Sequence, residues 1–217
     1  MMTPTMSDVV IFDLDDTLYE EFDFMKSAFH AIAVQLGCNS LSSEMMDIWF
    51  KGDNVFETII QEYNLSYSVE ELLDIYRNHL PQISLNHQAI EVLDWLKKKN
   101  CILGIITDGR SLTQRNKIKA LTLDDWIPHD NIIISDEFGS AKPDVRNYRF
   151  FMDKFPRTNY VYVGDNPAKD FITPNELGWR TIGIKNRGKN IHRQITKEKV
   201  YEPKVWVENI SVIKTIL

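Results

Sequence analysis

Short apolar runs alternate with longer stretches of helical periodicity over most of the chain. The runs are rich in β-branched residues and continuously apolar, which is typical of strands buried on both faces of a sheet. The predicted strands are 9–14, 102–107, 132–135, 160–164 and 181–184, and the predicted helices are 87–99, 112–121, 145–154 and 168–177. This alternation predicts an α/β fold, with a doubly wound (Rossmann-like) parallel sheet covered by helices on both sides.

Residues 20–85 break this alternation. Apolar and aromatic residues recur there at helical spacing, as in Phe22, Met25 and Phe29, and no strand-like run interrupts them. A connection of this length is far longer than a single crossover helix requires. The pattern predicts a small α-helical domain at 20–85, inserted into an α/β core formed by 1–19 and 86–217. On spacing alone, the alternative that these helices extend the main core stays open.

Composition is that of a water-soluble globular protein. Hydrophobic residues make up 43% and charged residues 26% of the 217 residues, and both fractions are ordinary. The net charge is −6, from 31 acidic and 25 basic residues, which argues against a nucleic-acid partner because phosphate backbones require a basic face. No stretch resembles a secretory signal or a membrane span. The two cysteines, Cys38 and Cys101, predict free thiols and a cytoplasmic location.

The first predicted strand stops at two carboxylates separated by one residue. In an extended strand Asp13 and Asp15 point to the same side. Paired carboxylates at a strand end can hold Mg²⁺, or can divide the roles of nucleophile and proton donor. Asp or Thr ending a strand and capping the next helix is the simpler alternative, and the motif alone does not decide between them.

A second pair of acids follows the fourth predicted strand. Asp165 stands at the strand end, and Asp170 lies five residues further along. Both carboxylates can serve one cation or orient its water ligands. A turn followed by a helix cap explains the same residues equally well.

Two further segments place polar groups beyond the strand ends. Thr107, Asp108 and Gly109 follow the second strand, where a hydroxyl and backbone N–H groups at a helix start can bind phosphate oxygens, although the segment also suits an ordinary turn. Lys142 precedes Pro143, which biases its backbone to an extended form. A single lysine is usually a solvated surface residue, so Lys142 gains its interest from the other groups.

Taken in order, these residues resemble the four motifs of the haloacid dehalogenase-like hydrolase superfamily. The matching segments are Asp13-x-Asp15-x-Thr17, Thr107, Lys142 and Gly164-Asp165-x-x-x-x-Asp170. The resemblance covers 1–19 and 86–217. It implies that Asp13 attacks phosphorus to form an aspartyl-phosphate, while Asp15 protonates the leaving oxygen and then activates water.

The resemblance also implies how the substrate and a metal are held. Thr107 and Lys142 would bind the transferring phosphoryl group. Asp13, the backbone carbonyl of Asp15, and Asp165 would hold Mg²⁺, with Asp170 as a further ligand or as an orienting group. These roles agree with the general demand of phosphoryl transfer for positioning and charge neutralisation.

The acid at position 15 favours one chemistry within the superfamily. Haloacid dehalogenases and phosphonate-cleaving relatives lack an acid at the position of Asp15. We therefore expect a Mg²⁺-dependent phosphatase acting on a small phosphorylated metabolite, such as a sugar phosphate or a nucleotide. A sugar phosphomutase or phosphotransferase is the nearest alternative, and a non-catalytic binding protein with this fold is a weaker one. The motifs identify neither the substrate nor the oligomeric state.

The insertion at 20–85 falls between the first and second motifs, so it resembles the small helical cap of one subgroup. We expect hinges near 19–22 and 83–86 that let the cap close over the substrate. Within the cap, Lys51, Asp53 and Asn54 form a candidate specificity loop, for which a surface turn is the alternative.

Other polar residues receive simpler interpretations. Arg110 is a candidate substrate contact, although an exposed arginine at a helix start is an alternative. We expect all histidines to be surface or packing residues. The basic segment 185–204 is expected to be a solvated loop; its bases include Lys185, Arg187, Lys189, Arg193, Lys197, Lys199 and Lys204.

Overall fold

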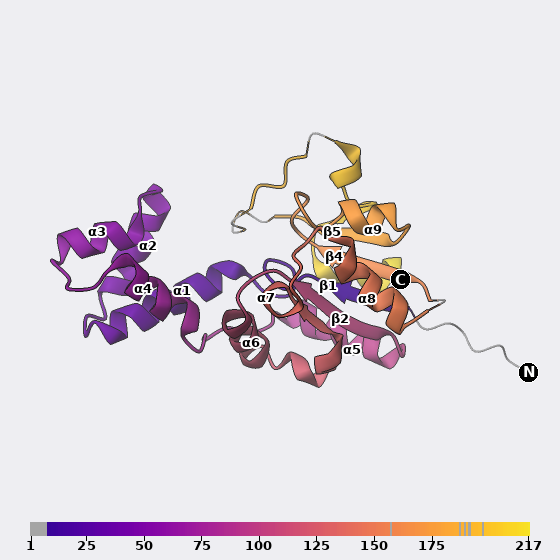
Figure 1. The fold of residues 1–217 in the computed structure, drawn as a ribbon, viewed down its shortest axis with the longest axis horizontal. Helices are drawn as coiled ribbons and strands as arrows, with labels where there is room; N and C mark the ends of the chain where they lie inside the picture. Colours follow the sequence, from indigo (N-terminus) through magenta and orange to yellow (C-terminus); the bar gives the residue numbers. More distant parts are fainter. Residues whose placement is uncertain (1–7, 157, 187, 189, 191, 197) are drawn as a thin grey trace, which may run out of the picture.

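The computed structural model describes residues 8–156, 158–186, 188, 190, 192–196 and 198–217. Their centre is one sheet in which every neighbouring pair of strands is parallel (Figure 1). Its strand order is β3-β2-β1-β4-β5-β6. The strands are β1 (Val9–Phe12), β2 (Ile102–Thr107), β3 (Ile132–Ile134), β4 (Tyr160–Gly164), β5 (Arg180–Ile184) and β6 (Val205–Val207). The predicted doubly wound α/β fold is confirmed.

Strand β1 is central and buried on both faces. Its Val9 is in register with Ile102 of β2 on one side and Tyr160 of β4 on the other. All four residues of β1 are buried, which accounts for its continuous apolar run. The strand order reverses at β1, and open α/β sheets bind ligands beyond the carboxyl ends of strands at such a point.

Helices cover the two faces of the sheet. Val10 and Phe12 of β1 point into one apolar cluster, to which α5, α6 and α10 contribute, while Val9 and Ile11 point into another, with residues of α8. The α-helices of this part are α5 (His87–Lys98), α6 (Ser111–Ala120), α7 (Ser135–Phe138), α8 (Val145–Lys154), α9 (Ile172–Glu176) and α10 (Ile213–Ile216). The short 3₁₀ helices are η1 (Leu123–Asp125), η2 (His129–Asn131), η3 (Lys199–Tyr201) and η4 (Ile210–Val212).

Four helices between β1 and α5 form a helical lobe beside the sheet (Figure 1). They are α1 (Glu21–Gln35), α2 (Leu41–Lys51), α3 (Val55–Glu62) and α4 (Val69–Asn78). The lobe has an apolar cluster of its own, formed by Met25, Phe29, Ile32, Ala33, Leu41, Met45, Ile48, Val55, Ile59 and Leu72. Helix α4 packs against α6, which joins the lobe to the rest of the fold. The division of the chain at 19/20 and 85/86 stays a prediction.

Several predicted boundaries were wrong. The first strand ends at Phe12 and the third at Ile134, because Ser135 already begins α7. The predicted helix 168–177 starts only at Ile172, since the preceding residues form a turn. Strand β6 was missed because it has only three residues and is partly exposed. No helix in the described part of the chain is both long enough and apolar enough to cross a membrane.

Candidate active site

The carboxyl ends of β1, β2 and β4 bring four predicted site residues together. Asp13 directly follows β1, Thr107 ends β2 and Asp165 follows β4. With Asp15, which follows Asp13, they line a cavity of about 80 Å³. Its complete lining is Asp13, Asp15, Glu21, Thr107, Asp108, Asp165, Asn166, Lys169 and His192. Parallel strands place these side chains at one edge, as the sequence predicted.

Lys142 is buried against the acids of this edge. Its Nζ lies 2.6 Å from Oδ1 of Asp13 and 2.8 Å from Oδ1 of Asp170, and its side chain is fully buried. It also donates a hydrogen bond to the Tyr162 hydroxyl at 3.2 Å. Burial by itself lowers the pKa of Lys142, but Asp13 and Asp170 hold that pKa well above its ordinary value. Lys142 is therefore a fixed positive charge beside Asp13.

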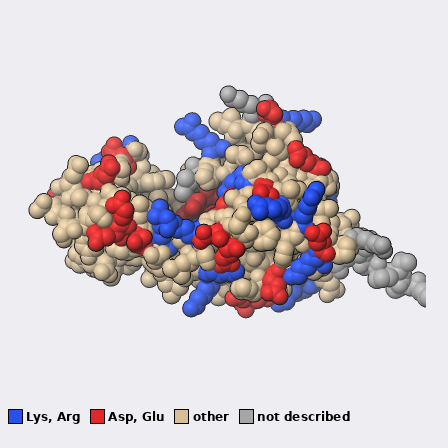
Figure 2. Space-filling model, viewed as in Figure 1, with Lys and Arg blue, Asp and Glu red and all other residues tan. Residues whose placement is uncertain are grey.

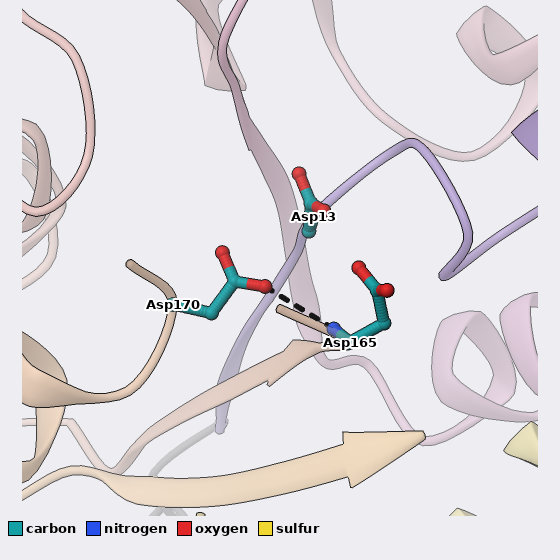
Figure 3. A group of neighbouring side chains, drawn as sticks. All are labelled: Asp13, Asp165 and Asp170. Carbon is teal, nitrogen blue, oxygen red and sulfur yellow. Dashed lines mark hydrogen bonds between the residues drawn. The ribbon is translucent and has the colours of Figure 1, made fainter. Parts of the chain in front are cut away.

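Asp13, Asp165 and Asp170 form a buried group of carboxylates (Figure 3). One carboxylate oxygen from each lies within 4.8 Å of the others. Asp170 accepts hydrogen bonds from the backbone N–H groups of Asp165 at 3.1 Å and Asn166 at 2.8 Å. Asp170 thus fixes the turn that carries Asp165, in addition to holding Lys142.

The electrostatics of this group suit a bound cation. Burial raises the pKa of Asp165 to about 9, and the neighbouring Asp13 and Asp170 add to the effect. Burial likewise raises the pKa of Asp13, although Lys142 opposes the rise. Such shifts mean that one lysine does not neutralise three buried carboxylates. The all-oxygen donor set fits a divalent metal of the hard class.

Asp15 lies in the same cavity, where three donors surround its carboxylate. Lys117 Nζ lies 2.7 Å from Oδ1, Gln114 Nε2 donates to Oδ2 at 2.9 Å, and the Tyr19 hydroxyl donates to Oδ1. Burial alone would raise the pKa of Asp15, but Lys117 and these hydrogen bonds lower it below its ordinary value. Asp15 is therefore ionised and acts as an acceptor in this arrangement.

Sequence reasoning missed Gln114 and Lys117, although a signal was present. Both lie on α6 at positions that continue, towards its start, the apolar stripe formed by Ile118 and Leu121. The side chains of all four residues are buried. Polar residues on the buried face of a helix require buried partners. The same argument marks them as candidate site residues.

The turn after β2 delivers two predicted residues to the cavity. Thr107 accepts a hydrogen bond from Gln114 Nε2 at 2.6 Å. Asp108 accepts one from the backbone N–H of Lys142 at 3.0 Å and one from Lys169 Nζ at 2.9 Å. Gly109 lies outside the lining set, and its N–H donates to the Ser135 hydroxyl at 2.9 Å.

Four further candidates lie outside the cavity lining. Arg110 is exposed at the start of α6. Lys51 ends α2, and Asn54 begins α3, where its side chain accepts the N–H of Glu57. Among the described residues that line the cavity, none is Arg110, Lys51, Asp53 or Asn54. These residues lie at helix ends and in a surface turn.

The segment after β5 reaches the site, contrary to prediction. Asn190 Nδ2 donates to Oδ2 of Asp165 at 2.9 Å, and Gln194 Nε2 donates to the carbonyl oxygens of Asp165 and Ile184, both at 2.7 Å. His192 is exposed, as expected for a surface residue, and it also lines the cavity. No periodic pattern marks these residues, because the segment meets Asp165 only through tertiary folding.

The bases of this segment differ in their surroundings. Lys185 pairs with Glu208, while Lys204 donates to the carbonyl oxygen of Trp179 at 2.5 Å. Arg193 and Lys199 are exposed. The predicted bases Arg187, Lys189 and Lys197 lie outside the described residues. On the face drawn in Figure 2, acidic and basic side chains are mixed over the core and the lobe.

Comparisons with known proteins agree with this site. A glyceraldehyde 3-phosphate phosphatase of Methanocaldococcus jannaschii is 27% identical over 192 residues, covering 81% of this chain and 83% of that protein. The pyrimidine 5'-nucleotidase YjjG of Escherichia coli is 23% identical over 195 residues, covering 82% of this chain and 85% of the relative. These relatives are named for the hydrolysis of phosphate esters.

A solved structure shares the fold over nearly the whole chain. The putative HAD-hydrolase YfnB of Bacillus subtilis, bound to magnesium, superposes with a TM-score of 0.68 at 15% identity. The match covers 98% of this chain and 99% of that one. The family model described as Haloacid dehalogenase-like hydrolase matches residues 10–184, which contain all four motifs. The chain therefore belongs to the haloacid dehalogenase-like hydrolases, and it is a hydrolase.

Proposed function

We propose that this protein is a Mg²⁺-dependent phosphatase that hydrolyses small phosphomonoesters through an aspartyl-phosphate. The observation that carries the proposal is the buried Lys142 beside Asp13, with Asp15 lining the same cavity. A carboxylate nucleophile next to a fixed cation and a second carboxylate is suited to phosphoryl transfer. The names of the phosphatase and nucleotidase relatives support this class of reaction.

The proposed reaction has two steps. A carboxylate oxygen of Asp13 bonds to phosphorus while the bond from phosphorus to the leaving oxygen breaks, and a proton from Asp15 passes to that oxygen. Water then attacks phosphorus and gives a proton to Asp15, and the bond to Asp13 breaks with release of phosphate. The Thr107 hydroxyl, which lines the cavity, would hold a phosphoryl oxygen, while Lys142 supplies a fixed positive charge beside Asp13. Asp15 is ionised in the resting site. It therefore first takes up a proton from the monoanionic form of the phosphate ester, and then passes that proton to the leaving oxygen.

We assign the metal to the carboxylate group of Figure 3. Asp13, Asp165 and the backbone carbonyl of Asp15 would hold Mg²⁺, with Asp170 as a ligand or an orienting group. When bound, the ion neutralises these carboxylates and the charge of the phosphoryl group. The raised pKa of Asp165 supports the assignment, since that carboxylate has no cationic partner among the described residues. The hydrogen bond from Asn190 orients this carboxylate without neutralising it.

We propose that residues 20–85 form a cap over this cavity and select the leaving group. Glu21 of α1 lines the cavity, so the lobe already contributes to its wall. Closure on hinges near 19–22 and 83–86 would exclude water from the reacting phosphoryl group. The name of the glyceraldehyde 3-phosphate phosphatase relative makes a triose phosphate a candidate substrate.

Phosphate release from a panel of esters tests the proposal. The panel with Mg²⁺ contains glycerol 3-phosphate, glyceraldehyde 3-phosphate, hexose phosphates, pyrimidine 5'-monophosphates and p-nitrophenyl phosphate. We expect release from at least one ester, a loss of at least about 10³-fold in Asp13→Asn, and full activity in Asp153→Asn. Asp153 is a matched control because it is an exposed aspartate outside the cavity lining. Equal release by wild type and Asp13→Asn would refute the proposal.

The same panel separates the nearest alternative chemistry. A phosphomutase would convert one hexose phosphate into its isomer without releasing phosphate, because it keeps water away from the aspartyl-phosphate. Product analysis by ³¹P NMR therefore distinguishes transfer from hydrolysis. Isomer without free phosphate would replace the phosphatase proposal by the mutase.

A further inference from the structure

The contacts of Asp15 single out helix α6 as part of the catalytic arrangement. Gln114 Nε2 bridges two predicted site residues, since it lies 2.9 Å from Oδ2 of Asp15 and 2.6 Å from Oγ1 of Thr107. Lys117 Nζ approaches the other carboxylate oxygen of Asp15 at 2.7 Å. Both oxygens of the carboxylate are thereby fixed in direction.

These two residues are buried in a way that packing alone does not explain. Side chains of Gln114 and Lys117 are almost completely buried, and burying such groups is costly without partners. The Lys117 ammonium stands 4.3 Å from the centre of the Phe24 ring and 3.9 Å from the Glu21 carboxylate. Its shortest ionic contact is nevertheless with Asp15.

Gly109 leaves room for the Gln114 side chain to reach Thr107. A Cβ atom on Gly109 would lie 3.0 Å from the side chain of Gln114, which is tighter than ordinary contact. The φ of Gly109 is +150°, a conformation that other residues rarely adopt. The turn after β2 is therefore shaped to admit the Gln114 amide.

The helix that carries both residues also contacts the helical lobe. Thr113 Oγ1 donates to the carbonyl oxygen of Arg77 at 3.0 Å, and Asn116 Nδ2 donates to those of Asn78 and His79 at 3.2 and 3.1 Å. These carbonyls lie at the end of α4. These bonds join α6 to the helical lobe, while Gln114 and Lys117 on the same helix reach Asp15.

We propose that Lys117 and Gln114 are positioning residues that aim the carboxyl group of Asp15 at the leaving oxygen. The inference rests on the proposed function and extends it to α6. In the proposed first step Asp15 donates a proton, so a misplaced carboxyl group slows only those esters whose leaving oxygen requires that proton. Alkyl phosphates belong to this class. An aryl phosphate such as p-nitrophenyl phosphate leaves as a stable anion and needs no proton.

The test compares kcat/KM for glycerol 3-phosphate and p-nitrophenyl phosphate. This ratio reports the steps up to departure of the leaving group, so the later hydrolysis of the aspartyl-phosphate does not enter. We expect Lys117→Met to lower it about 10- to 100-fold for glycerol 3-phosphate but less than about threefold for p-nitrophenyl phosphate. Gln114→Met should act in the same direction. Lys119→Met is the matched control, because Lys119 is an exposed lysine on the same helix.

The outcomes are separable. A loss confined to the alkyl ester supports the positioning role, whereas equal losses, or no loss, for both esters overturn it. If Lys117→Met does not fold, Gln114→Met tests the positioning role in the same way. It removes the hydrogen bonds that the Gln114 side chain donates to Asp15 and Thr107, and it keeps a side chain of similar size. Wild-type protein that releases phosphate from no ester of the panel contradicts the proposed function itself, and this is seen before any variant is compared.

Discussion

A Cβ atom on Gly164 would lie 2.5 Å from Oδ2 of Asp170, so residue 164 has no room for a side chain. The same oxygen accepts the backbone N–H groups of Asp165 and Asn166. The other carboxylate oxygen holds Lys142 at 2.8 Å. Packing at a single glycine therefore constrains the turn of Asp165 and the position of Lys142 together.

Gly164→Ala is expected to weaken Mg²⁺ binding and to lower activity. The added methyl group must displace the Asp170 carboxylate, at a cost of about 1–3 kcal/mol in the free energy of unfolding. A Mg²⁺ titration followed by thermal unfolding measures the effect. Gly139→Ala is the control, because residue 139 has open space but a positive φ. The Gly139→Ala variant should be less stable than the wild type but should have the same midpoint in the Mg²⁺ titration. The same midpoint in Gly164→Ala as in the wild type would contradict the prediction.

Lys142→Met is expected to destabilise the protein strongly. The variant leaves Asp13 and Asp170 buried without their cation, and breaking such a buried pair costs roughly 3–5 kcal/mol. Adding Asp13→Asn should recover part of that loss, because one of the two uncompensated charges disappears. Urea unfolding of the single and double variants measures the coupling. Strictly additive losses would show that the two groups do not interact.

A surface pair provides the control for that cycle. Lys26 and Asp23 lie 3.6 Å apart with about half of each side chain exposed to solvent. Lys26→Met should change the free energy of unfolding by no more than about 0.5 kcal/mol, because solvent screens the pair.

Mg²⁺ is expected to raise the unfolding temperature of the wild type but not that of Asp165→Asn. The ion would relieve the repulsion among buried carboxylates, and a ligand at about 100 times its Kd adds about 2.7 kcal/mol of stability. Asp153→Asn, an exposed acid, should respond like the wild type. Chelation with EDTA should remove the shift together with phosphatase activity. A full Mg²⁺ shift in Asp165→Asn would place the ion elsewhere.

Acid is expected to destabilise the helical lobe through His79. Its Nδ1 lies 2.8 Å from the carbonyl oxygen of Tyr76, and its Nε2 lies 3.1 Å from the Ser27 hydroxyl. The N–H of Gln82 donates to that hydroxyl at 2.7 Å, so the hydroxyl proton is free to point at Nε2. This arrangement suits neutral His79, in which Nδ1–H donates to the Tyr76 carbonyl and Nε2 accepts from Ser27.

The sign of the pH effect follows from the pKa. Burial lowers the pKa of His79 below 6.5, and Lys117 lowers it further. The unfolded chain therefore binds the proton more readily, and stability falls as pH drops below about 6.5. Unfolding temperatures from about pH 8 to about pH 5 measure this loss, which His79→Gln should reduce. His30→Gln, at an exposed histidine, should keep the wild-type dependence.

Most of the α/β core was predictable because its signals are local. Continuous apolar runs revealed five of the six strands, and acids or hydroxyls directly after them marked the functional edge of the sheet. Failures occurred where the local signal was weak. Strand β6 is short and half exposed, and the start of α9 depends on a turn organised by Asp170 rather than on helix propensity.

The partners of the site residues were less predictable. An irregular segment supplies three residues of the site, Asn190, His192 and Gln194. No periodic pattern in the sequence predicts that this segment lies next to Asp165. Gln114 and Lys117 were visible as polar residues on an apolar stripe, but the stripe alone does not say which group they meet. Such pairings depend on how elements pack, which is a property of the whole chain.

The sequence by itself determined that Asp13 and Asp15 follow a buried strand, because the apolar run and the two-residue alternation are local consequences of strand geometry. The order of the motifs likewise determined the family. Only the tertiary structure decided the surroundings of Asp15, since Lys117 is 102 residues away along the chain and reaches Asp15 through the packing of α6. Side-chain spacing fixes which face a residue takes, whereas contacts between distant elements fix its electrostatics.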